Sequence, residues 1–593
     1  MKYDSNQLKK MADAVRVYAL GALRAAKNGH AGIVLGASDI ITVIYANWMR
    51  RGRDRFVLSA GHGSAMLYAV LKLAGYDIGD LKTFRQIGGL PGHPEYGIDG
   101  VDATTGPLGQ GVGNAVGMAM AAKICGDGGR VYCLCSDGDL MEGVAQESIG
   151  FAGRYKLNNL ILFWDDNGIS IDGVAQTDMN IPRRMAAAGW TVLTTRGDNP
   201  RGLDAAIAHA HKIDGPVFIR CTTTIGAGAS IAGTSRAHGL ALSDTEMADL
   251  INLYASHMGE KLWATVAKRA PAPGGTIPDA PARPIVPTPQ TPRDVISTRE
   301  LSGIFLAQLV ATDKCLIGGS ADLSASTNVK TPAHIDITPD NFNGNFINYG
   351  VREHAMGAIM NGLAIAGAHP YGSTFLVFSD YMRPSIRLAA LSGLPVIYVL
   401  THDSIAVGPD GPTHQPIEQL PSLRLIPNLN VWRPCNMDEV AAAWRSGVDA
   451  TSHPTCLILS RQAIRQIKTP SPDDILRGGY VIYPGRGRIR MTLIATGGEV
   501  PLAVSVAEKM RGVAVVSMPC LEIFRAQSAA YRASVLRGRI IAIEAATPTP
   551  WFEFADAVIG MDSFGMSGPG DDVYRHFGFD VDTIVREISK NFK

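Results

Sequence analysis

The chain has 593 residues, of which 46% are hydrophobic and 18% charged, and its formal net charge is +1. The length suggests roughly four domains, and the composition is that of a globular enzyme. Because the charges balance, no global field attracts nucleic acid or an anionic membrane, and any anion has to be bound locally.

The eight cysteines are scattered, and no Cys-x-x-Cys pair occurs. We therefore expect reduced thiols in a cytoplasmic protein. The first six residues lack the apolar core of a signal peptide, and no stretch approaches the ~20 consecutive apolar residues of a membrane span. Neither nucleic acid nor a membrane is expected as a partner.

In chain order, the first informative segment is the glycine-rich run 106–113. We predict a strand-to-helix turn here, in which glycine lets the backbone approach a ligand closely. A dinucleotide-binding Gly-x-Gly-x-x-Gly motif starting at Gly109 would need glycine where Asn114 stands, and no P-loop motif is present. Glycines that serve only the turn and helix packing remain an alternative.

A strand–helix–strand unit follows. Predicted strand 130–136 runs into Asp137 and Gly138, and predicted strand 160–164 runs into a segment containing Asn167 and Ile169. Ligands of open parallel sheets bind at the carboxyl ends of the strands. A carboxylate and an amide oxygen at that edge suit a hard cation such as Mg²⁺ that carries a diphosphate. The unit therefore predicts a diphosphate cofactor.

A proline-rich segment, 270–293, should run extended over the surface, because proline supports neither helix nor inner strand. Strands alternate with helices on both sides of it, with later strands at 491–496, 513–518 and 537–544 and a loop around 465–490 that opens a third domain. This pattern predicts an α/β fold of three doubly wound domains with mostly parallel sheets. The predicted boundaries are domains at 1–269, 297–470 and 471–593 and a linker at 270–296.

Six histidines occur in turn-like contexts. A single loop histidine is most simply a surface group, but several at strand ends suit proton transfer near pH 7 and hydrogen bonds to sugar hydroxyls. The six are His30, His62, His93, His238, His402 and His414. The absence of closely spaced His/Cys pairs argues against a zinc site.

Other candidates are ambiguous from the residues alone. Glu353 precedes a predicted helix at 355–366, where a glutamate commonly just complements the helix dipole. Phe375, Phe378 and Tyr381 have spacing that fits a core stripe as well as a stacking platform. Lone basic residues such as Arg299 and Arg461 are most simply solvated charges.

Together, however, these motifs resemble those of transketolase, the thiamine diphosphate-dependent ketol transferase family, over about 1–250 and 297–593. The Gly-Asp-Gly…Asn-x-Ile metal signature is similar to residues 136–138 and 167–169. The further matching segments are 58–64, 104–111, 165–173, 349–353, 401–404 and 410–416.

The resemblance implies two thiamine diphosphate-binding folds, a C-terminal α/β domain and a set of cofactor contacts. Asp137, Asn167 and the Ile169 carbonyl would hold Mg²⁺, with Ca²⁺ left open. Glu353 would hydrogen-bond the pyrimidine, and Glu142 would support it across a homodimer interface. The remaining implied cofactor contacts are His62, Gly106, Leu108, Gly138, Phe375, Phe378 and Tyr381.

The implied reaction transfers a two-carbon ketol unit from a ketose phosphate such as xylulose 5-phosphate to an aldose phosphate, by way of a dihydroxyethyl adduct, in the pentose phosphate pathway or the Calvin cycle. His30 and His238 would border the donor C3 hydroxyl, His93 and His414 the C1 side, and Asp410 the acceptor C2 hydroxyl. The family's phosphate clamp corresponds to Arg299, Ser326, His402 and Arg461. Charge-assisted bonds of this kind contribute ~1.5–3 kcal/mol each.

The chain also departs from the family pattern. Ser136 replaces a glycine beside the metal-binding aspartate and would crowd the diphosphate or add a hydrogen bond. Ala325 replaces a proline, and the residues around His238 are unusual for the family. Segments 174–184 and 250–296 are shorter than in the family. Two alternatives therefore stay open. One is a sibling enzyme, such as dihydroxyacetone synthase or a specialised ketol transferase, and the other is a catalytically silent paralogue. Deoxyxylulose-phosphate synthase fits the motifs less well.

Overall fold

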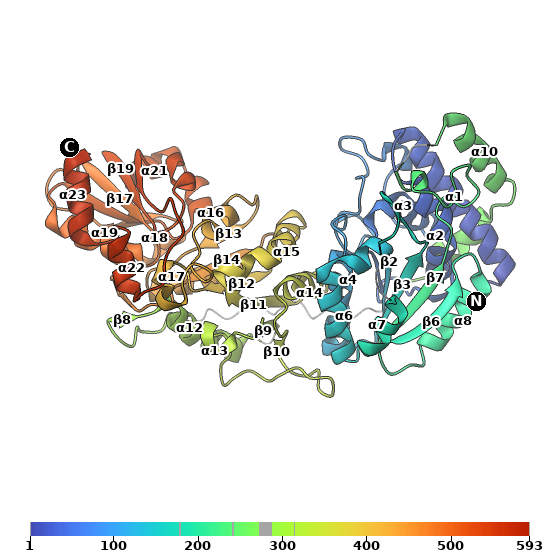
Figure 1. The fold of residues 1–593 in the computed structure, drawn as a ribbon, viewed down its shortest axis with the longest axis horizontal. Helices are drawn as coiled ribbons and strands as arrows, with labels where there is room; N and C mark the ends of the chain where they lie inside the picture. Colours follow the sequence, from blue (N-terminus) through green and yellow to red (C-terminus); the bar gives the residue numbers. More distant parts are fainter. Residues whose placement is uncertain (1, 177–179, 240–241, 272–286, 314, 592–593) are drawn as a thin grey trace. The chain divides into compact units, whose positions relative to one another are not determined.

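The computed structural model describes residues 2–176, 180–239, 242–271, 287–313 and 315–591 (Figure 1). Most of the predicted linker 270–296 and part of the short segment 174–184 lie outside these residues. The chain forms two compact units. The first comprises Met1–Asp279, Thr338–Phe342 and Ala358–Gly367, and the second comprises Ala280–Ile337, Asn343–Gly357 and Ala368–Lys593.

The first unit is built on a five-stranded, fully parallel sheet. The predicted strands 130–136 and 160–164 are confirmed as its β2 and β3. In sheet order the strands are β1 (Arg55–Leu58), β2 (Val131–Ser136), β3 (Leu160–Asp166), β7 (Val217–Thr222) and β6 (Thr191–Arg196).

Helices cover both faces of this sheet, because successive residues of a strand point to opposite sides. Tyr132 and Leu134 of β2 join the core formed with α1 (Ser5–Ala26), α2 (Ala31–Val43) and α3 (Ser64–Leu73). On the other side, α4 (Gln110–Cys125) packs on β2 and on α6 (Gly143–Arg154) (Figure 1). The remaining helices are α5 (Asp137–Met141), α7 (Ile181–Ala187), α8 (Pro200–Ala210), α9 (Arg236–Gly239), α10 (Asp244–Ala255) and α11 (Glu260–Ala267).

Among the described residues, one helical stretch, Ala31–Trp48, has the length and apolarity of a possible membrane span, with a mean hydropathy of 1.3. It is 89% buried within the protein. A core helix that is apolar all round accounts for this pattern.

The second unit contains a six-stranded parallel sheet. In sheet order its strands are β10 (Phe346–Asn348), β9 (Leu316–Ser320), β11 (His369–Phe375), β12 (Ile397–Thr401), β14 (Thr455–Leu459) and β13 (Asn430–Trp432). The helices with it are α12 (Thr298–Thr312), α13 (Ser324–Thr327), the start of α14 (Glu353–Ile365), α15 (Ser379–Leu391), α16 (Gln419–Arg424) and α17 (Met437–Asp449). From Ala358 onwards, α14 belongs to the first unit. The predicted helix 355–366 thus begins two residues earlier, at Glu353 itself.

A second sheet in the same unit has the order β16 (Tyr480–Tyr483), β18 (Val513–Ser517), β17 (Met491–Ala495), β19 (Arg539–Ile543) and β20 (Ala557–Ile559). Only its edge strand β16 is antiparallel among these strands. The segment 465–490, expected to be a loop, contains this strand. Four residues between Gly479 and Pro484 give little local signal, and pairing with the distant β18 decides their conformation. The sheet's helices are α19 (Glu499–Lys509), α20 (Leu521–Arg525), α21 (Ala529–Val535), α22 (Gly570–His576) and α23 (Val581–Asn591).

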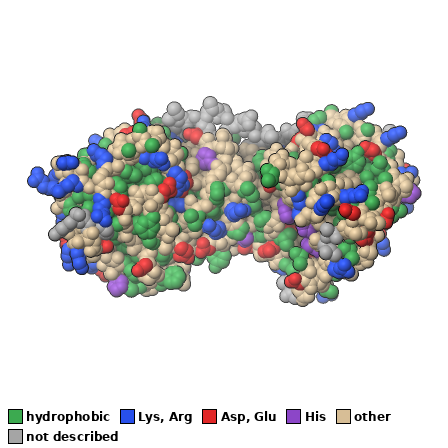
Figure 2. All heavy atoms as spheres, turned by 90° about the horizontal axis from the view of Figure 1, so that it is seen from above, with side chains coloured by type: hydrophobic (Ala, Val, Ile, Leu, Met, Phe, Trp, Pro, Cys, Tyr) green, Lys and Arg blue, Asp and Glu red, His purple; other side chains and the backbone are tan. Residues whose placement is uncertain are grey.

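Both sheets of the second unit contribute to one hydrophobic core, which includes Val399 and Leu457 from the first and Leu493 and Val515 from the second. The architecture is the expected α/β one with mostly parallel strands. On the face drawn in Figure 2, basic side chains lie among acidic ones, as the net charge of +1 leads one to expect.

Candidate functional site

A cavity of ≈ 220 Å³ opens in the first unit at the carboxyl ends of β2 and β3. The residues that line it and that the sequence predicted are His62, Leu108, Asp137, Gly138, Asn167, Ile169 and His238. The structure adds Ile33, Ser136, Ser170, Ile171, Asp172 and Ile225. The cavity is therefore at the sheet edge where the sequence placed a ligand.

Asp137 has a free acceptor beside this cavity. Its Oδ1 accepts a hydrogen bond from Trp164 Nε1 at 3.2 Å, whereas its buried Oδ2 has no partner among the described residues. Burial, and then the nearby Asp165 and Asp166, raises the pKa of Asp137 to about 7. A bound cation would satisfy Oδ2, because buried polar atoms are normally paired, and its charge would favour the ionised carboxylate against that shift.

Asn167 is held in place by its neighbours. Its Nδ2 donates to Asp165 Oδ2 at 3.1 Å, and its Oδ1 accepts from the Ile169 amide at 3.0 Å. The amide oxygen and the following backbone are thereby fixed beside Asp137. This donor set of carboxylate, amide and carbonyl oxygens fits a hard cation such as Mg²⁺.

The predicted glycine turn is confirmed. Gly106 has φ 148° and Gly109 φ 79°, both in the region that favours glycine, and α4 begins directly after Gly109. A Cβ at position 138 would lie 2.8 Å from Leu108 Cδ1, so a larger residue there would displace the Leu108 side chain. The turn at 106–109 and the start of α5 at Gly138 thus come close together at the cavity.

Asp139, a residue not among those predicted from the sequence, ties the segments around Ser59, Gly109 and Ser136 together and is 0% exposed. Its Oδ1 accepts from Ser59 Oγ at 2.6 Å and the Gly109 amide at 2.7 Å, and its Oδ2 from the amide and hydroxyl of Ser136 at 2.9 and 3.0 Å. Ser136 and Asp139 form a capping box at the start of α5, a signal readable in the sequence as serine followed three residues later by an acid. The hydroxyl of Ser136 is thus engaged by Asp139.

Four predicted histidines come together in the first unit. Ring centroids of His30 lie 5.4 Å from His62, 6.2 Å from His93 and 5.6 Å from His238, and His62 lies 5.0 Å from His238. They come from the start of α2, from the turn before α3, from the loop before α4 and from α9. Arg85 Nη2 lies 3.4 Å from His30 Nδ1.

Burial favours the neutral form of these four histidines. Burial, then Arg85 and the neighbouring imidazoles, lowers the pKa of His30 to about 4. Burial, then His238 and His30, lowers the pKa of His62 to about 3. Burial also lowers the pKa of His93 and of His238. Neutral imidazoles can accept a proton from a hydroxyl.

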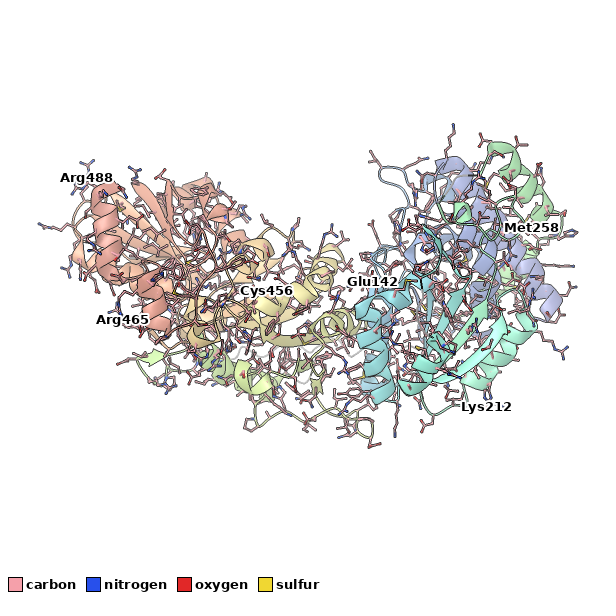
Figure 3. The ribbon with its side chains drawn as sticks, in the orientation of Figure 1. Glu142, Lys212, Met258, Cys456, Arg465 and Arg488 are labelled. Carbon is pink, nitrogen blue, oxygen red and sulfur yellow. The ribbon has the colours of Figure 1, made fainter. Side chains whose placement is uncertain are left out.

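Glu142 lies at the junction of α5 and α6 and is exposed at the surface of the first unit (Figure 3).

In the second unit, Glu353 opens α14 and is 9% exposed. Its Oε1 accepts a hydrogen bond from Thr374 Oγ1 at 3.3 Å, and burial raises its pKa. A carboxyl group that retains its proton more readily can share that proton with an aromatic nitrogen. The interpretation of Glu353 as a surface glutamate that only complements the helix dipole is therefore wrong.

The three aromatic residues form a row. Phe375 and Phe378 are stacked with centroids 5.8 Å apart, and Tyr381 follows at 6.2 Å from Phe378. Tyr381 is 64% exposed, so this is not a core stripe. His414, which is half-buried, lies 5.3 Å from Phe378.

Basic groups gather at the carboxyl edge of the six-stranded sheet. Arg299, in the first turn of α12, donates to the carbonyl of Ser326, and its Nε has no partner among the described residues. Burial, and then Arg461, lowers the pKa of Arg299. Burial, followed by Arg299 and Arg461, lowers the pKa of His402 to about 3. A group of basic side chains such as Arg299, Arg461 and His402 is suited to binding an anion. Asp410, at the end of the short helix Ile405–Asp410, is exposed.

The predicted residues thus form two groups, one in each unit. The first combines the Asp137–Asn167 cavity, which His62 and His238 line, with His30 and His93 close to those two rings. The second combines Glu353, the aromatic row and the basic group.

Family models match three segments of the chain. Residues 7–262 match the thiamine diphosphate binding domain of transketolase, residues 294–466 its pyrimidine binding domain, and residues 478–580 a transketolase-like C-terminal domain.

Whole-length relatives agree with these matches. A transketolase from Sinorhizobium medicae is 40% identical over 98% of this chain and 93% of its own length. Transketolase from Campylobacter jejuni has a similar structure, with a TM-score of 0.91 and 34% identity over 99% of this chain and 100% of that one. Transketolase from Pichia stipitis in complex with sedoheptulose 7-phosphate has a TM-score of 0.88 and 34% identity over 99% and 97%.

Proposed function

The chain belongs to the transketolase family, and from this premise we propose that it transfers a two-carbon ketol unit from a phosphorylated ketose to a phosphorylated aldose. Its activity is that of a thiamine diphosphate-dependent transferase of the transketolase type. The observation that carries the proposal is a cluster of four histidines, two of which, His62 and His238, line the Asp137–Asn167 cavity.

A divalent cation, Mg²⁺ or Ca²⁺, would be held by Asp137, Asn167 and the carbonyl of Ile169, with the cofactor's diphosphate near His62 and the 106–109 turn. The unpartnered Asp137 Oδ2 supports this assignment. Gly106, Leu108 and Gly138 would line the diphosphate site, and the engagement of Ser136 by Asp139 makes the serine compatible with it.

The cofactor, when bound, supplies the carbanion that attacks the donor carbonyl. Glu353 would share a proton with its pyrimidine ring, which the buried, raised-pKa carboxyl favours. Phe375, Phe378 and Tyr381 would form the wall against that ring. Glu142 would support Glu353 of the partner subunit.

The imidazoles would move the substrate protons. His30 and His238 would take the proton from the donor C3 hydroxyl and return it later, and their lowered pKa values keep them unprotonated for this step. His93 and His414 would hydrogen-bond the C1 end, and Asp410 the C2 hydroxyl of the acceptor.

The basic group would hold the sugar phosphate. Arg299, Ser326, His402 and Arg461 lie at one sheet edge, and the mutually unfavourable charges of the two arginines would be relieved by a bound dianion. The Pichia stipitis structures named for their complexes with sugar phosphates support phosphorylated substrates.

We place the two groups of residues together in a homodimer, with the first unit of one subunit facing the second unit of its partner. The domains would be 1–269, 297–470 and 471–593, joined by the linker 270–296. The eight free cysteines support a reducing, cytoplasmic location, and the reaction would serve the pentose phosphate pathway or the Calvin cycle.

A coupled assay with xylulose 5-phosphate and ribose 5-phosphate, thiamine diphosphate and Mg²⁺ tests the proposal. Turnover is expected, whereas turnover only with formaldehyde as acceptor would indicate dihydroxyacetone synthase. Failure to bind the cofactor in calorimetry would indicate a silent paralogue.

The phosphate clamp has a matched control. Arg461→Gln should raise KM for the phosphorylated donor roughly tenfold, as the loss of one charge-assisted bond implies. Arg465→Gln, four residues further along at the surface (Figure 3), should leave KM unchanged. Equal effects of the two variants would contradict the assignment of Arg461.

A further inference from the structure

His402 has an unusual backbone. Its φ is 63°, in the left-handed region that a non-glycine residue rarely adopts, and its side chain is only 3% exposed. Such a conformation persists only where the surroundings impose it, and it is frequent at functional sites. On one side the ring stacks on Phe375, with centroids 3.6 Å apart, and its Nδ1 lies 2.8 Å from Thr401 Oγ1.

The residue after His402 is fixed by a buried arginine. Asp403 Oδ2 accepts from Arg433 Nε at 3.0 Å and lies 2.8 Å from its Nη2. Both side chains are 1% exposed. The ion pair therefore anchors the chain directly beyond the left-handed residue.

Arg433 is in turn held by the C-terminal sheet and its helices. Its Nη1 donates to Thr496 Oγ1 at 3.0 Å and to Glu499, and lies 3.5 Å from Glu544 Oε1. Arg424 binds Glu544 through both Nη groups, at 2.7 and 3.0 Å. All of these residues belong to the second unit.

A second set of hydrogen bonds holds the His402 segment at Ser404. The hydroxyl of Tyr574, in α22, donates to Glu499 Oε1 at 2.5 Å and lies 3.0 Å from Ser404 Oγ. Gln462, the neighbour of Arg461, donates to the same Ser404 Oγ at 3.5 Å. The C-terminal part of the chain thus contacts the His402 segment directly and is linked to the Arg461 segment through Ser404.

We propose that Asp403 and Arg433, together with Tyr574, are positioning residues by which the C-terminal sheet and its helices hold His402 and the Arg461 segment in the geometry that binds the donor's phosphate. The proposal rests on the proposed function, because His402 and Arg461 are assigned there to the phosphate. It gives the C-terminal domain a role in affinity for phosphorylated substrates rather than in the chemical step.

Two variants test this without leaving an unpaired cation. The network contains two guanidinium groups, Arg424 and Arg433, and three carboxylates, Asp403, Glu499 and Glu544. Asp403→Asn therefore leaves two of each, and Tyr574→Phe removes one hydroxyl. Tyr480→Phe is the control, because its hydroxyl donates to Glu439 Oε1 at 2.8 Å in the same unit.

The readout is KM and kcat for xylulose 5-phosphate and for an unphosphorylated ketol donor such as hydroxypyruvate. Asp403→Asn and Tyr574→Phe should raise KM for the phosphorylated donor by about five- to tenfold, the effect of ~1 kcal/mol or slightly more. Both kcat values, KM for hydroxypyruvate and the dissociation constant of thiamine diphosphate should stay near wild type. Tyr480→Phe should change none of these.

Equal increases in KM for both donors, or effects no larger than those of Tyr480→Phe, would overturn the proposal. If Asp403→Asn does not fold, Tyr574→Phe alone decides. A wild-type enzyme that turns over only hydroxypyruvate would instead refute the assignment of the phosphate clamp, and the positioning role would fall with it.

Discussion

Replacing Asp139 by asparagine should weaken both the first unit and its cofactor site. The carboxylate accepts four hydrogen bonds, from Ser59, Gly109 and, twice, Ser136. In the amide, one oxygen becomes an NH₂ group. The serine hydroxyls can rotate to accept from it, but one backbone N–H, of Gly109 or of Ser136, would face another donor.

The cost follows from that count. One buried donor left unpaired costs about 1–3 kcal/mol, and the remaining bonds lose their charge assistance. Burial raises the pKa of Asp139, so the charge itself is disfavoured there and its removal offsets part of the loss. We expect the free energy of unfolding to fall by roughly 2 kcal/mol.

Urea unfolding followed by tryptophan fluorescence measures this loss, and calorimetry measures cofactor affinity. Asp54→Asn is the matched control, because Asp54 is also buried and accepts from the amides of Arg130 and Arg50, at 2.9 and 3.0 Å. It should lower stability without changing the dissociation constant of thiamine diphosphate, whereas Asp139→Asn should raise that constant about tenfold, equivalent to ~1.4 kcal/mol. A stability change below about 0.5 kcal/mol for Asp139→Asn, the size of a surface substitution, would refute the reasoning.

Four further predictions concern single groups. Glu353→Gln should lower kcat by roughly 10²–10⁴-fold while cofactor binding persists, because an amide cannot share a proton with the ring; a near-wild-type rate in the coupled assay would contradict this. Tyr381→Ala should cost about 1 kcal/mol of cofactor affinity with an unchanged melting temperature, since the ring is exposed; calorimetry and thermal unfolding separate the two. The pKa of His30 and of His62 is lowered to about 4 and about 3, so the unfolded chain, with pKa near 6.5, binds more protons in between. Stability should be full above pH 6.5 and fall as the pH drops towards 3, and His62→Asn should flatten that profile in melting-temperature measurements. EDTA should abolish cofactor binding until Mg²⁺ is restored, and Asp137→Asn should raise the Mg²⁺ needed; unchanged calorimetric titrations would count against the cation site.

Local patterns predicted most of the fold. The apolar runs before Asp137 and Asn167 are β2 and β3, and the glycine turn before α4 has the backbone angles that only glycine adopts easily. These features depend on residues close together in the chain. The edge strand β16 was missed because its partner β18 is remote. The Ser136–Asp139 capping box was readable in the sequence, but the bonds of Asp139 to the remote Ser59 and Gly109 were not.

For the candidate site, too, the sequence decided some assignments and left others open. Spacing could not decide between core stripe and platform for the aromatic row, nor identify Glu353 as more than a helix-end acid. The exposure of Tyr381 excludes a core stripe, and the burial of Glu353 beside Thr374 excludes an exposed helix-end acid.

The sequence by itself determined which strands end in metal-type oxygen ligands and which turns require glycine, since these are properties of short segments. Only the tertiary structure decided that four histidines from separate turns come together and that Arg433 anchors the strained His402 segment. The reason is physical: burial and the proximity of charges set pKa values and backbone strain, and both arise only when distant segments pack together.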